Sequence, residues 1–383
     1  MEKIIYRNRR NTNSYKWDII PSEYDKGETI PAWVADMDFA VPKCVRDAII
    51  KSGRFGVYGY SFAGKDYYNN FIKWEKKRFN HTIERDWIRF STGVVAAINW
   101  IVQSMTNPGD AIIIQTPVYH QFAESVKSNK RKLICNDLVN TDGVYTINFE
   151  DFEKKIKDNN VKMFIMCSPH NPVGRVWKKE ELVKMIEICK NHDVIVLSDE
   201  IHHDFAFNNN KHIPTMSISD YDKLIMLTSS TKTFNLAALE NSIIIIKDKK
   251  LRDIYDAKTS DIHESSGNII GYIAAEAAFG GGEEWLEQVK SIIYSNYELL
   301  KKSLLGKYDK LTISPLEGTY LAWVDFGAYL KPEEISDFFK KKCGVIFNLG
   351  EDFGGDCKSF VRINLATSKK NIQTICSRIK QNL

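Results

Sequence analysis

The sequence predicts an α/β fold divided into two domains, and three observations lead to this prediction. The chain has 383 residues, which is more than one hydrophobic core usually serves. From about residue 87, short apolar runs alternate with longer amphipathic runs, which is the pattern of a parallel sheet covered by helices. After three consecutive glycines at 280–282 the pattern changes to one long helix followed by short strands, which indicates a smaller α+β unit.

Each element of the first unit is predicted from the periodicity of its apolar residues. Short apolar runs predict strands, and longer amphipathic runs predict helices. Four consecutive isoleucines at 243–246 suit a strand that is buried on both faces. The predicted strands cover residues 111–115, 162–167, 194–198, 224–228 and 242–246, and the predicted helices cover residues 94–105 and 178–190.

The second unit begins with a long helical pattern at 283–305, which we expect to lead out of the large domain. Residues 1–45 cannot be assigned to either unit from composition or periodicity. Beyond the long helix, strands are predicted at 311–314, 320–325, 345–348 and 359–364, and helices at 332–342 and 368–379.

Composition and charge exclude several classes of function. There are 53 basic and 49 acidic side chains, and the basic clusters at 76–78, 247–250 and 340–342 are typical of solvated helix ends, so no nucleic-acid partner is expected. The seven cysteines are scattered without a Cys-x-x-Cys pair, which predicts no metal site and indicates a reducing compartment. The charged N-terminus and the lack of a long apolar run predict a soluble, cytoplasmic protein without membrane segments.

Lys232 is the central candidate for chemistry. It lies in the run Ser-Ser-Thr-Lys-Thr-Phe-Asn-Leu-Ala at 229–237, directly after an apolar strand candidate. A lysine packed among hydroxyl groups at the end of a buried strand loses its proton more easily than a surface lysine and can act as an amine nucleophile. Two upstream segments also follow strand candidates, Ser-Pro-His-Asn-Pro-Val-Gly at 168–174 and Leu-Ser-Asp-Glu-Ile-His at 197–202.

Taken in order, these three motifs resemble those of fold-type I pyridoxal-phosphate enzymes. Residues 9–18 and 31–39 are similar to the N-terminal segments of the MalY/PatB group of carbon–sulfur β-lyases, usually described as cystathionine β-lyases. The resemblance covers nearly the whole chain and continues through residues 58–61, 92–95, 116–119, 318–321 and 360–364.

The resemblance implies a fold, a domain division and an assembly. The expected fold is the fold-type I transferase fold, with a large domain in which a mostly parallel seven-stranded sheet lies between helices. The large, cofactor-binding domain is expected at 46–285. The small domain is expected to combine residues 1–45 with residues 286–383. The expected assembly is a homodimer in which Tyr60 reaches the cofactor phosphate across the interface.

Pyridoxal phosphate needs a lysine, a carboxylate for its ring nitrogen and a donor for its phenolic oxygen. Lys232 is the expected Schiff-base lysine. Asp199 follows the end of a strand, where open α/β sheets bind their ligands, and would keep the ring nitrogen protonated; a helix N-cap is its alternative role. Asn171 can donate its amide hydrogen to the phenolic oxygen, and His202 stands where related transaminases carry a tyrosine.

The cofactor also needs a stacking surface and a phosphate site. Tyr119 matches the stacking residue, with an ordinary core tyrosine as the alternative. A helix that begins at 93–95 after a strand offers free backbone amides to a phosphate dianion. The expected phosphate ligands are Gly93, Val94 and Val95, aided by the hydroxyls of Ser229 and Thr231.

Arg362 is the expected anchor of an amino-acid substrate. It is a charged residue in a strand where burial is expected, and a buried charge needs a partner anion. A substrate α-carboxylate can supply it through two parallel hydrogen bonds, and a structural salt bridge is the alternative. The resemblance also places Ala35, Tyr58 and Asn171 beside the substrate.

The predicted function is β-elimination from L-cystathionine, L-cystine or a related S-substituted cysteine, with thiol, pyruvate and ammonia as products. Lys232 would remove the α-proton, and the expected catalytic residues are Lys232, Asp199 and Tyr119. An aminotransferase needs the same residues, although the segment at 33–39 and Glu240, which stands where many transaminases carry an arginine, favour the lyase. A regulatory protein that retains the cofactor pocket is the alternative from another class.

Overall fold

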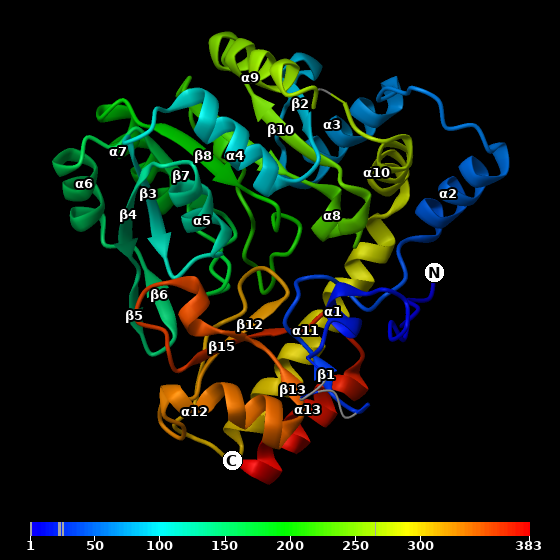
Figure 1. The fold of residues 1–383 in the computed structure, drawn as a ribbon, viewed down its shortest axis with the longest axis vertical. Coiled ribbons are helices and arrows are strands. Elements are labelled where there is room, and N and C mark those ends of the chain that lie inside the picture. Colours follow the sequence, from blue (N-terminus) through cyan, green and yellow to red (C-terminus); the bar gives the residue numbers. More distant parts are fainter. Residues whose placement is uncertain (1, 22–23, 25–26, 265) are drawn as a thin grey trace.

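The computed structural model describes residues 2–21, 24, 27–264 and 266–383. Two sheets organise these residues, one of seven strands in the upper part of Figure 1 and one of four strands in the lower part. Among the described helices, none is both long and apolar enough to cross a membrane. No group of three or more metal-ligating side chains is placed to hold a metal ion within the described residues.

The seven-stranded sheet is mostly parallel, as predicted. One strand, β10, runs antiparallel to both of its neighbours, and the other adjacent strands pair in parallel. The order across the sheet is β2 (Ile88–Ser91), β10 (Ser242–Ile246), β9 (Leu224–Thr228), β8 (Ile195–Asp199), β7 (Met163–Cys167), β3 (Ala111–Thr116) and β4 (Lys132–Asp137).

Side chains alternate between the two faces of this sheet because successive residues of a strand point in opposite directions. Ile112 and Ile114 of β3 pack in one core cluster, whereas Ile113 packs in another. All four isoleucines of 243–246 are fully buried, so this strand is covered on both faces as predicted. One face is covered by α4 (Val94–Met105), α5 (Gln121–Ser128) and α9 (Lys249–Asp261), and the other by α6 (Phe149–Asp158) and α7 (Lys179–Asn191).

Three further helices form a separate layer beside the sheet, α2 (Lys43–Phe55), α3 (Lys65–Phe79) and α10 (Ile269–Gly281). Their apolar faces join a core that also contains Met226 and Ile245 from the sheet. The short helix α8 (Ser230–Thr233) follows β9 directly, with the Ser229 hydroxyl accepting a hydrogen bond from the Thr231 amide at its start. A small hairpin is formed by β5 (Val139–Thr141) and β6 (Val144–Thr146).

The long helix α11 (Glu283–Leu305) has the predicted bounds and leads to the antiparallel four-stranded sheet. The predicted helix at 332–342 is divided, because α12 (Pro332–Asp337) continues as a π-helical turn over Phe338–Cys343. The predicted strand at 345–348 is two short strands that join different sheets. The remaining elements are β11 (Thr312–Ile313), β12 (Leu321–Asp325), β13 (Val345–Ile346), β14 (Asn348–Leu349), β15 (Phe360–Asn364) and α13 (Lys369–Asn382).

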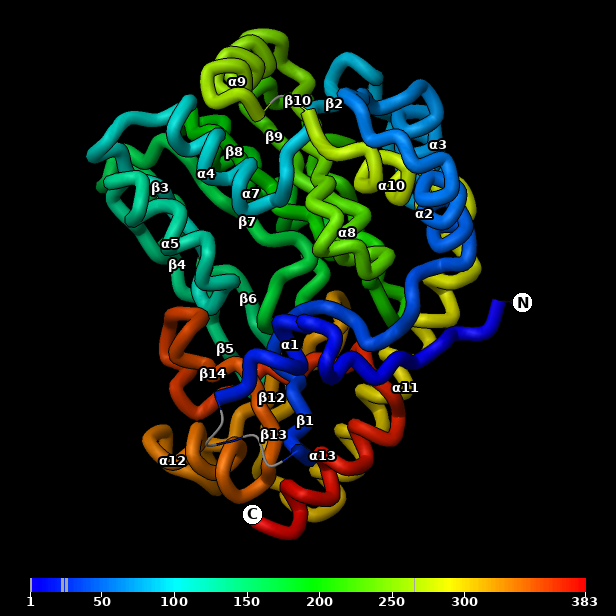
Figure 2. Tube along the Cα trace, turned by 45° about the vertical axis from the view of Figure 1, so that its right-hand side comes forward, coloured from blue at the N-terminus to red at the C-terminus, as the bar shows by residue number. Residues whose placement is uncertain are grey.

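The N-terminal residues lie against the C-terminal sheet rather than on the seven-stranded one. Strand β1 (Ile30–Pro31) pairs in parallel with β13, and the Ala32 carbonyl accepts a hydrogen bond of 2.9 Å from the amide of Asn364. Figure 2 shows this segment, with α1 (Tyr15–Asp18), passing between the two sheets. The described part of this segment, with Trp33, Val34 and Ala35, therefore borders the space between the sheets.

Candidate active site

A cavity of about 490 Å³ lies between the carboxyl ends of the parallel strands and the N-terminal segment. This is where open α/β sheets bind their ligands. Its wall includes ten residues that the sequence predicts for the site: Ala35, Gly93, Val94, Val95, Tyr119, Asn171, Asp199, His202, Lys232 and Arg362.

Lys232 reaches the cavity from α8. Its Nζ donates a hydrogen bond of 2.7 Å to the carbonyl of Ala35, which lies on the N-terminal segment. Burial lowers the pKa of this amine to about 8, although the carboxylates of Asp36 and Asp199 oppose that shift. An amine with such a pKa is partly neutral near physiological pH and can act as a nucleophile and as a base.

The position of α8 is fixed from behind by a buried ion network. The hydroxyl of Thr233 donates a 2.8 Å hydrogen bond to Asp204. Asp204 also lies 2.7 Å from Nε of Arg78 and 3.0 Å from Nε2 of His203. These charges compensate one another inside the protein, and the residue next to Lys232 is therefore held by a rigid group.

Asp199 is the last residue of β8 and is 6% exposed. Its Oδ1 accepts a hydrogen bond of 3.0 Å from the amide of Ile201. Burial raises the pKa of this carboxyl to about 7, against the effects of the Ile201 amide and of Lys232. A buried carboxylate of this kind is stabilised by a cationic ligand atom.

Arg362 lies on β15 and is 4% exposed, with uncharged partners. Its terminal nitrogens donate to Oδ1 of Asn171 at 3.0 Å, to Oδ1 of Asn348 at 2.6 Å and to the carbonyl of Trp33 at 3.1 Å. The guanidinium carbon also lies 4.9 Å from the ring centroid of Phe353. Among the described residues no carboxylate forms an ion pair with Arg362, which speaks against the structural salt bridge and leaves its charge for a ligand.

The bond to Arg362 also orients Asn171. Because its amide oxygen accepts from the guanidinium, the amide nitrogen is left as the donor on this side chain. His202 is buried beside it in the same wall, and its Nδ1 has no hydrogen-bond partner among the described residues. Burial, together with the charges of Lys232 and Arg362, lowers the pKa of His202 well below its usual value, so the ring is neutral.

The start of α4 forms the far end of the cavity. Gly93 precedes the helix without a side-chain cap, so the first backbone amides of α4 face the cavity. A Cβ placed on Gly93 would meet no atom within 4 Å, which shows open space at this helix end. Such an end attracts an anion because of its free amides and its dipole.

Four predicted site residues lie outside the cavity wall. Thr231 and Ser229 are buried beneath it, and the Ser229 hydroxyl lies 2.7 Å from both the Asn241 carbonyl and Oγ1 of Thr231. Tyr58 is 56% exposed and Tyr60 is fully exposed, so neither side chain contributes to the cavity of its own chain.

Several residues of the site were not predicted from the sequence. The hydroxyl of Tyr320 donates to the Ala35 carbonyl at 2.8 Å, so that carbonyl is shared with Lys232. Tyr320 belongs to the segment at 318–321, so the family resemblance could have indicated it as a site residue. Tyr15 and Trp33 line the cavity and belong to the N-terminal segments that carry the resemblance. His120 and Asn348 also line it, and no motif of the sequence indicates them.

The N-terminal segment is fastened to both sheets around Ala35. The side-chain amide nitrogen of Asn364 donates to the backbone carbonyls of Val34 and Asp36, each at 2.6 Å. Asn235, three residues after Lys232, accepts from the Met37 amide at 2.9 Å and donates to the Met37 carbonyl at 3.0 Å. The Ala35 carbonyl is therefore held at a fixed position over Lys232.

With this geometry established, comparison with known proteins identifies relatives of the chain. The model of the family "Aminotransferase class I and II" matches residues 34–379. Cystathionine beta-lyase PatB of Bacillus subtilis (strain 168) is 36% identical over 378 residues, which are 98% of each chain.

Two solved structures are similar over almost their whole length. Cystalysin from Treponema denticola, which contains pyridoxal 5'-phosphate, has a TM-score of 0.95 at 35% identity, with 99% of this chain and 97% of that chain covered. A pyridoxal-phosphate-bound protein of Clostridium difficile 630, provisionally named an aminotransferase, has a TM-score of 0.95 at 38% identity and 98% coverage of each chain.

Proposed function

Because the chain belongs to the class I and II aminotransferase family, we propose that it is a pyridoxal-phosphate-dependent carbon–sulfur β-lyase. It cleaves L-cystathionine or a related S-substituted cysteine to a thiol, pyruvate and ammonia. One observation carries this proposal: a half-buried lysine with a lowered pKa, a buried carboxylate and a buried arginine with uncharged partners surround one cavity.

The residues of the cavity fit pyridoxal phosphate. Asp199 suits the ring nitrogen, because a cation at that position relieves the cost of the buried carboxylate. The Nδ1 atom of His202 has no hydrogen-bond partner among the described residues, so it can bond to a polar atom of the cofactor. The open space at Gly93 and the free amides of α4 suit the phosphate. Tyr119 forms part of the wall and suits the face of the ring.

In the reaction, Arg362 binds the α-carboxylate of the substrate and fixes its orientation, since a guanidinium can form two parallel hydrogen bonds. The bound cofactor supplies a ring that accepts electrons from the α-carbon. Lys232 removes the α-proton, and its pKa of about 8 suits a group that takes up and releases a proton near neutral pH. The thiolate then leaves the β-carbon.

The segment around Ala35 is our structural reason for favouring elimination. This segment belongs to the part of the N-terminus that resembles the lyases, and its Ala35 carbonyl contacts Lys232 directly. Its neighbours Val34 and Asp36 are tied to Asn364, so the carbonyl restricts where the Lys232 amine moves after it has taken a proton. An amine whose movement is restricted in this way would favour loss of the β-substituent over delivery of the proton to another atom.

The test is incubation of the purified holoenzyme with L-cystathionine in the absence of any keto acid. We expect stoichiometric pyruvate and free thiol, measured by lactate dehydrogenase coupling and by a thiol reagent. An enzyme of the same preparation with Lys232→Ala is the matched control and should release neither product. Release that persists in the Lys232→Ala protein would contradict the assignment of the base.

An aminotransferase is the second candidate, supported by the similarity to the Clostridium difficile protein. It requires the same lysine, carboxylate and arginine. The same incubation distinguishes the two, since a transaminase turns over continuously only with an added keto acid and releases no thiol. Strict dependence on a keto acid would replace the lyase by the aminotransferase.

The proposal extends to assembly, location and domain division. Exposed apolar residues at 55–62 support a homodimer in which Tyr58 and Tyr60 complete the site of the partner chain. All seven cysteines are free thiols, which supports a cytoplasmic location. We also propose that the large domain covers 46–285 and that residues 1–45 join 286–383 in the small domain, and the pairing of β1 with β13 supports this division.

A further inference from the structure

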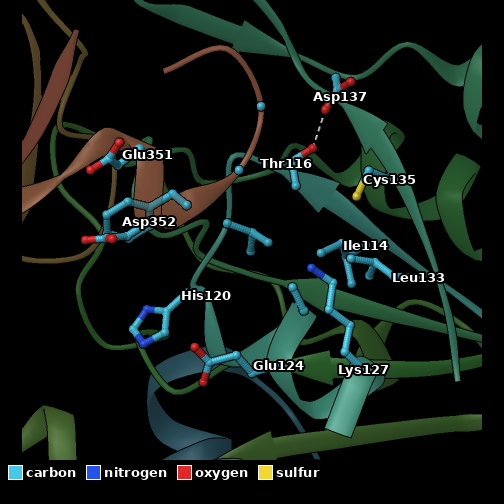
Figure 3. Close-up of a pocket in the computed structure, with 15 residues that line it drawn as sticks. Ile114, Thr116, His120, Glu124, Lys127, Leu133, Cys135, Asp137, Glu351 and Asp352 are labelled. Atoms are coloured by element: carbon cyan, nitrogen blue, oxygen red, sulfur yellow. Dashed lines mark hydrogen bonds between the residues drawn. The ribbon is translucent and has the colours of Figure 1, made fainter. Parts of the chain in front are cut away.

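A second cavity, of about 480 Å³, adjoins the active-site cavity. It opens between the ends of β3 and β4, helix α5 and the loop at 350–355 (Figure 3). His120 lines both cavities, so the two spaces adjoin at this side chain. None of the chemistry assigned above uses this second cavity.

The residues that border the second cavity lie close to Arg362, the proposed anchor of the substrate. His120 follows Tyr119, with 4.8 Å between the two ring centroids. Its Nδ1 is buried without a hydrogen-bond partner among the described residues, so this nitrogen is available to a ligand. Phe353 lines the second cavity, and its ring centroid is 4.9 Å from the guanidinium carbon of Arg362. A substrate held at Arg362 is thus next to the second cavity.

The second cavity carries charges of both signs. Its lining includes the carboxylates of Glu124, Glu351 and Asp352 and the ammonium group of Lys127. In the view of Figure 3 the His120 ring lies between the side chains of Asp352 and Glu124. A further carboxylate in the lining, that of Asp137, accepts a hydrogen bond from the Thr116 hydroxyl.

We infer that this cavity binds the distal amino-acid head group of the thioether substrate. Asp352 and Glu124 take the distal ammonium group, and Lys127 with His120 takes the distal carboxylate. The inference rests on the proposed function, because Arg362 must hold the α-carboxylate of the cysteine half. With that half fixed, the sulfur substituent extends to neighbouring space, and a zwitterionic head group matches mixed charges whereas an alkyl group does not.

The test compares three substrates of the holoenzyme that differ only beyond the sulfur. L-Cystathionine carries a distal zwitterion, S-(3-carboxypropyl)-L-cysteine lacks the distal ammonium group, and S-ethyl-L-cysteine carries no distal charge. Wild type should prefer L-cystathionine over the carboxypropyl analogue. The double variant Asp352→Asn, Glu124→Gln should lower kcat/KM for L-cystathionine roughly five- to tenfold through KM, which is the scale of two exposed ion pairs.

The matched control is Asp356→Asn, which removes an exposed carboxylate from the same loop outside the cavity. It should leave the preference for L-cystathionine unchanged. A second readout is calorimetric binding of L-cystathionine to the cofactor-loaded Lys232→Ala protein, where the two substitutions should weaken affinity by a similar factor.

Two failures are distinguishable. If wild type releases pyruvate from none of the thioethers, the proposed function fails and the inference fails with it. If wild type cleaves them but the double variant affects all three alike, or affects L-cystathionine in neither kinetics nor binding, only the distal site is overturned.

Discussion

At the scale of single residues, the chemistry of this site depends on three charged groups, two buried and one half-buried, whose charges are incompletely compensated. The fold shields Lys232, Asp199 and Arg362 from water. This shielding lowers the pKa of the lysine and of the arginine and raises the pKa of the aspartate, so it favours the neutral form of each. A protein that binds no charged ligand gains nothing from this arrangement, since buried charges cost stability. Each group therefore gives a prediction about the ligand that it serves.

The first prediction concerns Lys232. Because burial lowers the pKa of its amine to about 8, its neutral form should become dominant above about pH 8 instead of above the usual 10.5. The rate of covalent attachment of pyridoxal phosphate to the cofactor-free protein should thus rise with pH and level off above about 8. Stopped-flow absorbance measures the rate, and borohydride reduction with peptide mapping should place the label on Lys232. A label on another lysine would refute the assignment.

The second prediction concerns Asp199. In Asp199→Ala the ring nitrogen loses its counter-ion, whereas Lys232 and the amides of α4 still hold the cofactor. Turnover should fall by roughly a hundredfold or more, equivalent to about 3 kcal/mol in the barrier, with little loss of bound cofactor. Steady-state kinetics and the absorbance of the bound cofactor separate the two effects. Near-normal turnover would mean that another group serves the ring nitrogen.

The third prediction concerns Arg362. Arg362→Lys should raise KM for every amino-acid substrate, since one ammonium group cannot reproduce two parallel hydrogen bonds to a carboxylate. The expected loss in kcat/KM is roughly tenfold or more, on the scale of one charged hydrogen bond. The same change at Arg252 on α9, away from the cavity, is the control. Unchanged kinetics in Arg362→Lys would remove this arginine from the site.

At the scale of secondary-structure elements, the four-residue helix α8 is too short to be stable by itself. It is held by the strand before it and by the buried network beneath it. Asp204 joins Thr233 of this helix to Arg78 of α3 and to His203. The network therefore connects the position of Lys232 to the packing of the neighbouring helix layer.

The fourth prediction follows from this network. Asp204→Asn should lower the free energy of unfolding by roughly 3 kcal/mol or more, because Arg78 and His203 would lose the fully buried carboxylate that they share, although Glu287 and Glu75 would remain as counter-ions. Asp220→Asn, at an exposed carboxylate, should change it by less than about 0.5 kcal/mol. Chemical denaturation monitored by circular dichroism measures both. Equal small effects would show that the network does not stabilise α8.

Elements with long and regular patterns were predicted within one or two residues. The five predicted strands of the large sheet and the helices α4, α7 and α11 are all present, since burial on one or both faces imposes a clear period on their sequences. Strand β2 was expected only as a strand of unstated bounds before the helix at 93–95, and strand β4 and the π-helical turn at 338–343 were not predicted. Edge strands are buried on fewer sides, and a change of helix type depends on packing rather than on periodicity.

At the scale of the whole molecule, a segment within the described part of the chain exposes several large apolar side chains in succession. Residues 55–62 connect α2 to α3, and their exposure is unusual for apolar side chains. The exposed fractions are 75% for Phe55, 66% for Val57 and 82% for Phe62, and Tyr60 is fully exposed. A second copy of the chain is the proposed partner for this surface.

The fifth prediction tests that assembly. Phe55→Asp with Phe62→Asp should convert a dimer to a monomer, measured by sedimentation velocity, and should weaken binding of pyridoxal phosphate because Tyr60 no longer reaches the neighbouring site. Ile254→Asp on α9, which is 40% exposed, is the control and should leave the dimer intact. A monomeric wild type that binds the cofactor normally would contradict the shared site.

The sequence by itself determined which chemical groups are present, in which order they follow strands, and the class of the fold. Each of these depends on residues close together in the chain, such as the hydroxyl-rich run around Lys232 or the isoleucines of β10. The alternation of apolar runs likewise indicated the large sheet, because its period reflects burial that neighbouring residues experience together.

The family resemblance assigned distant residues to one site, but only the tertiary structure decided which of their atoms are in contact. Arg362 contacts Asn171, which is 191 positions away, and Lys232 contacts the carbonyl of Ala35 across 197 positions. Tyr320 and Asn348 entered the site for the same reason. Contacts of this kind are fixed by how the two sheets and the N-terminal segment pack, and packing of distant segments leaves no period or spacing in the local sequence from which it could be read.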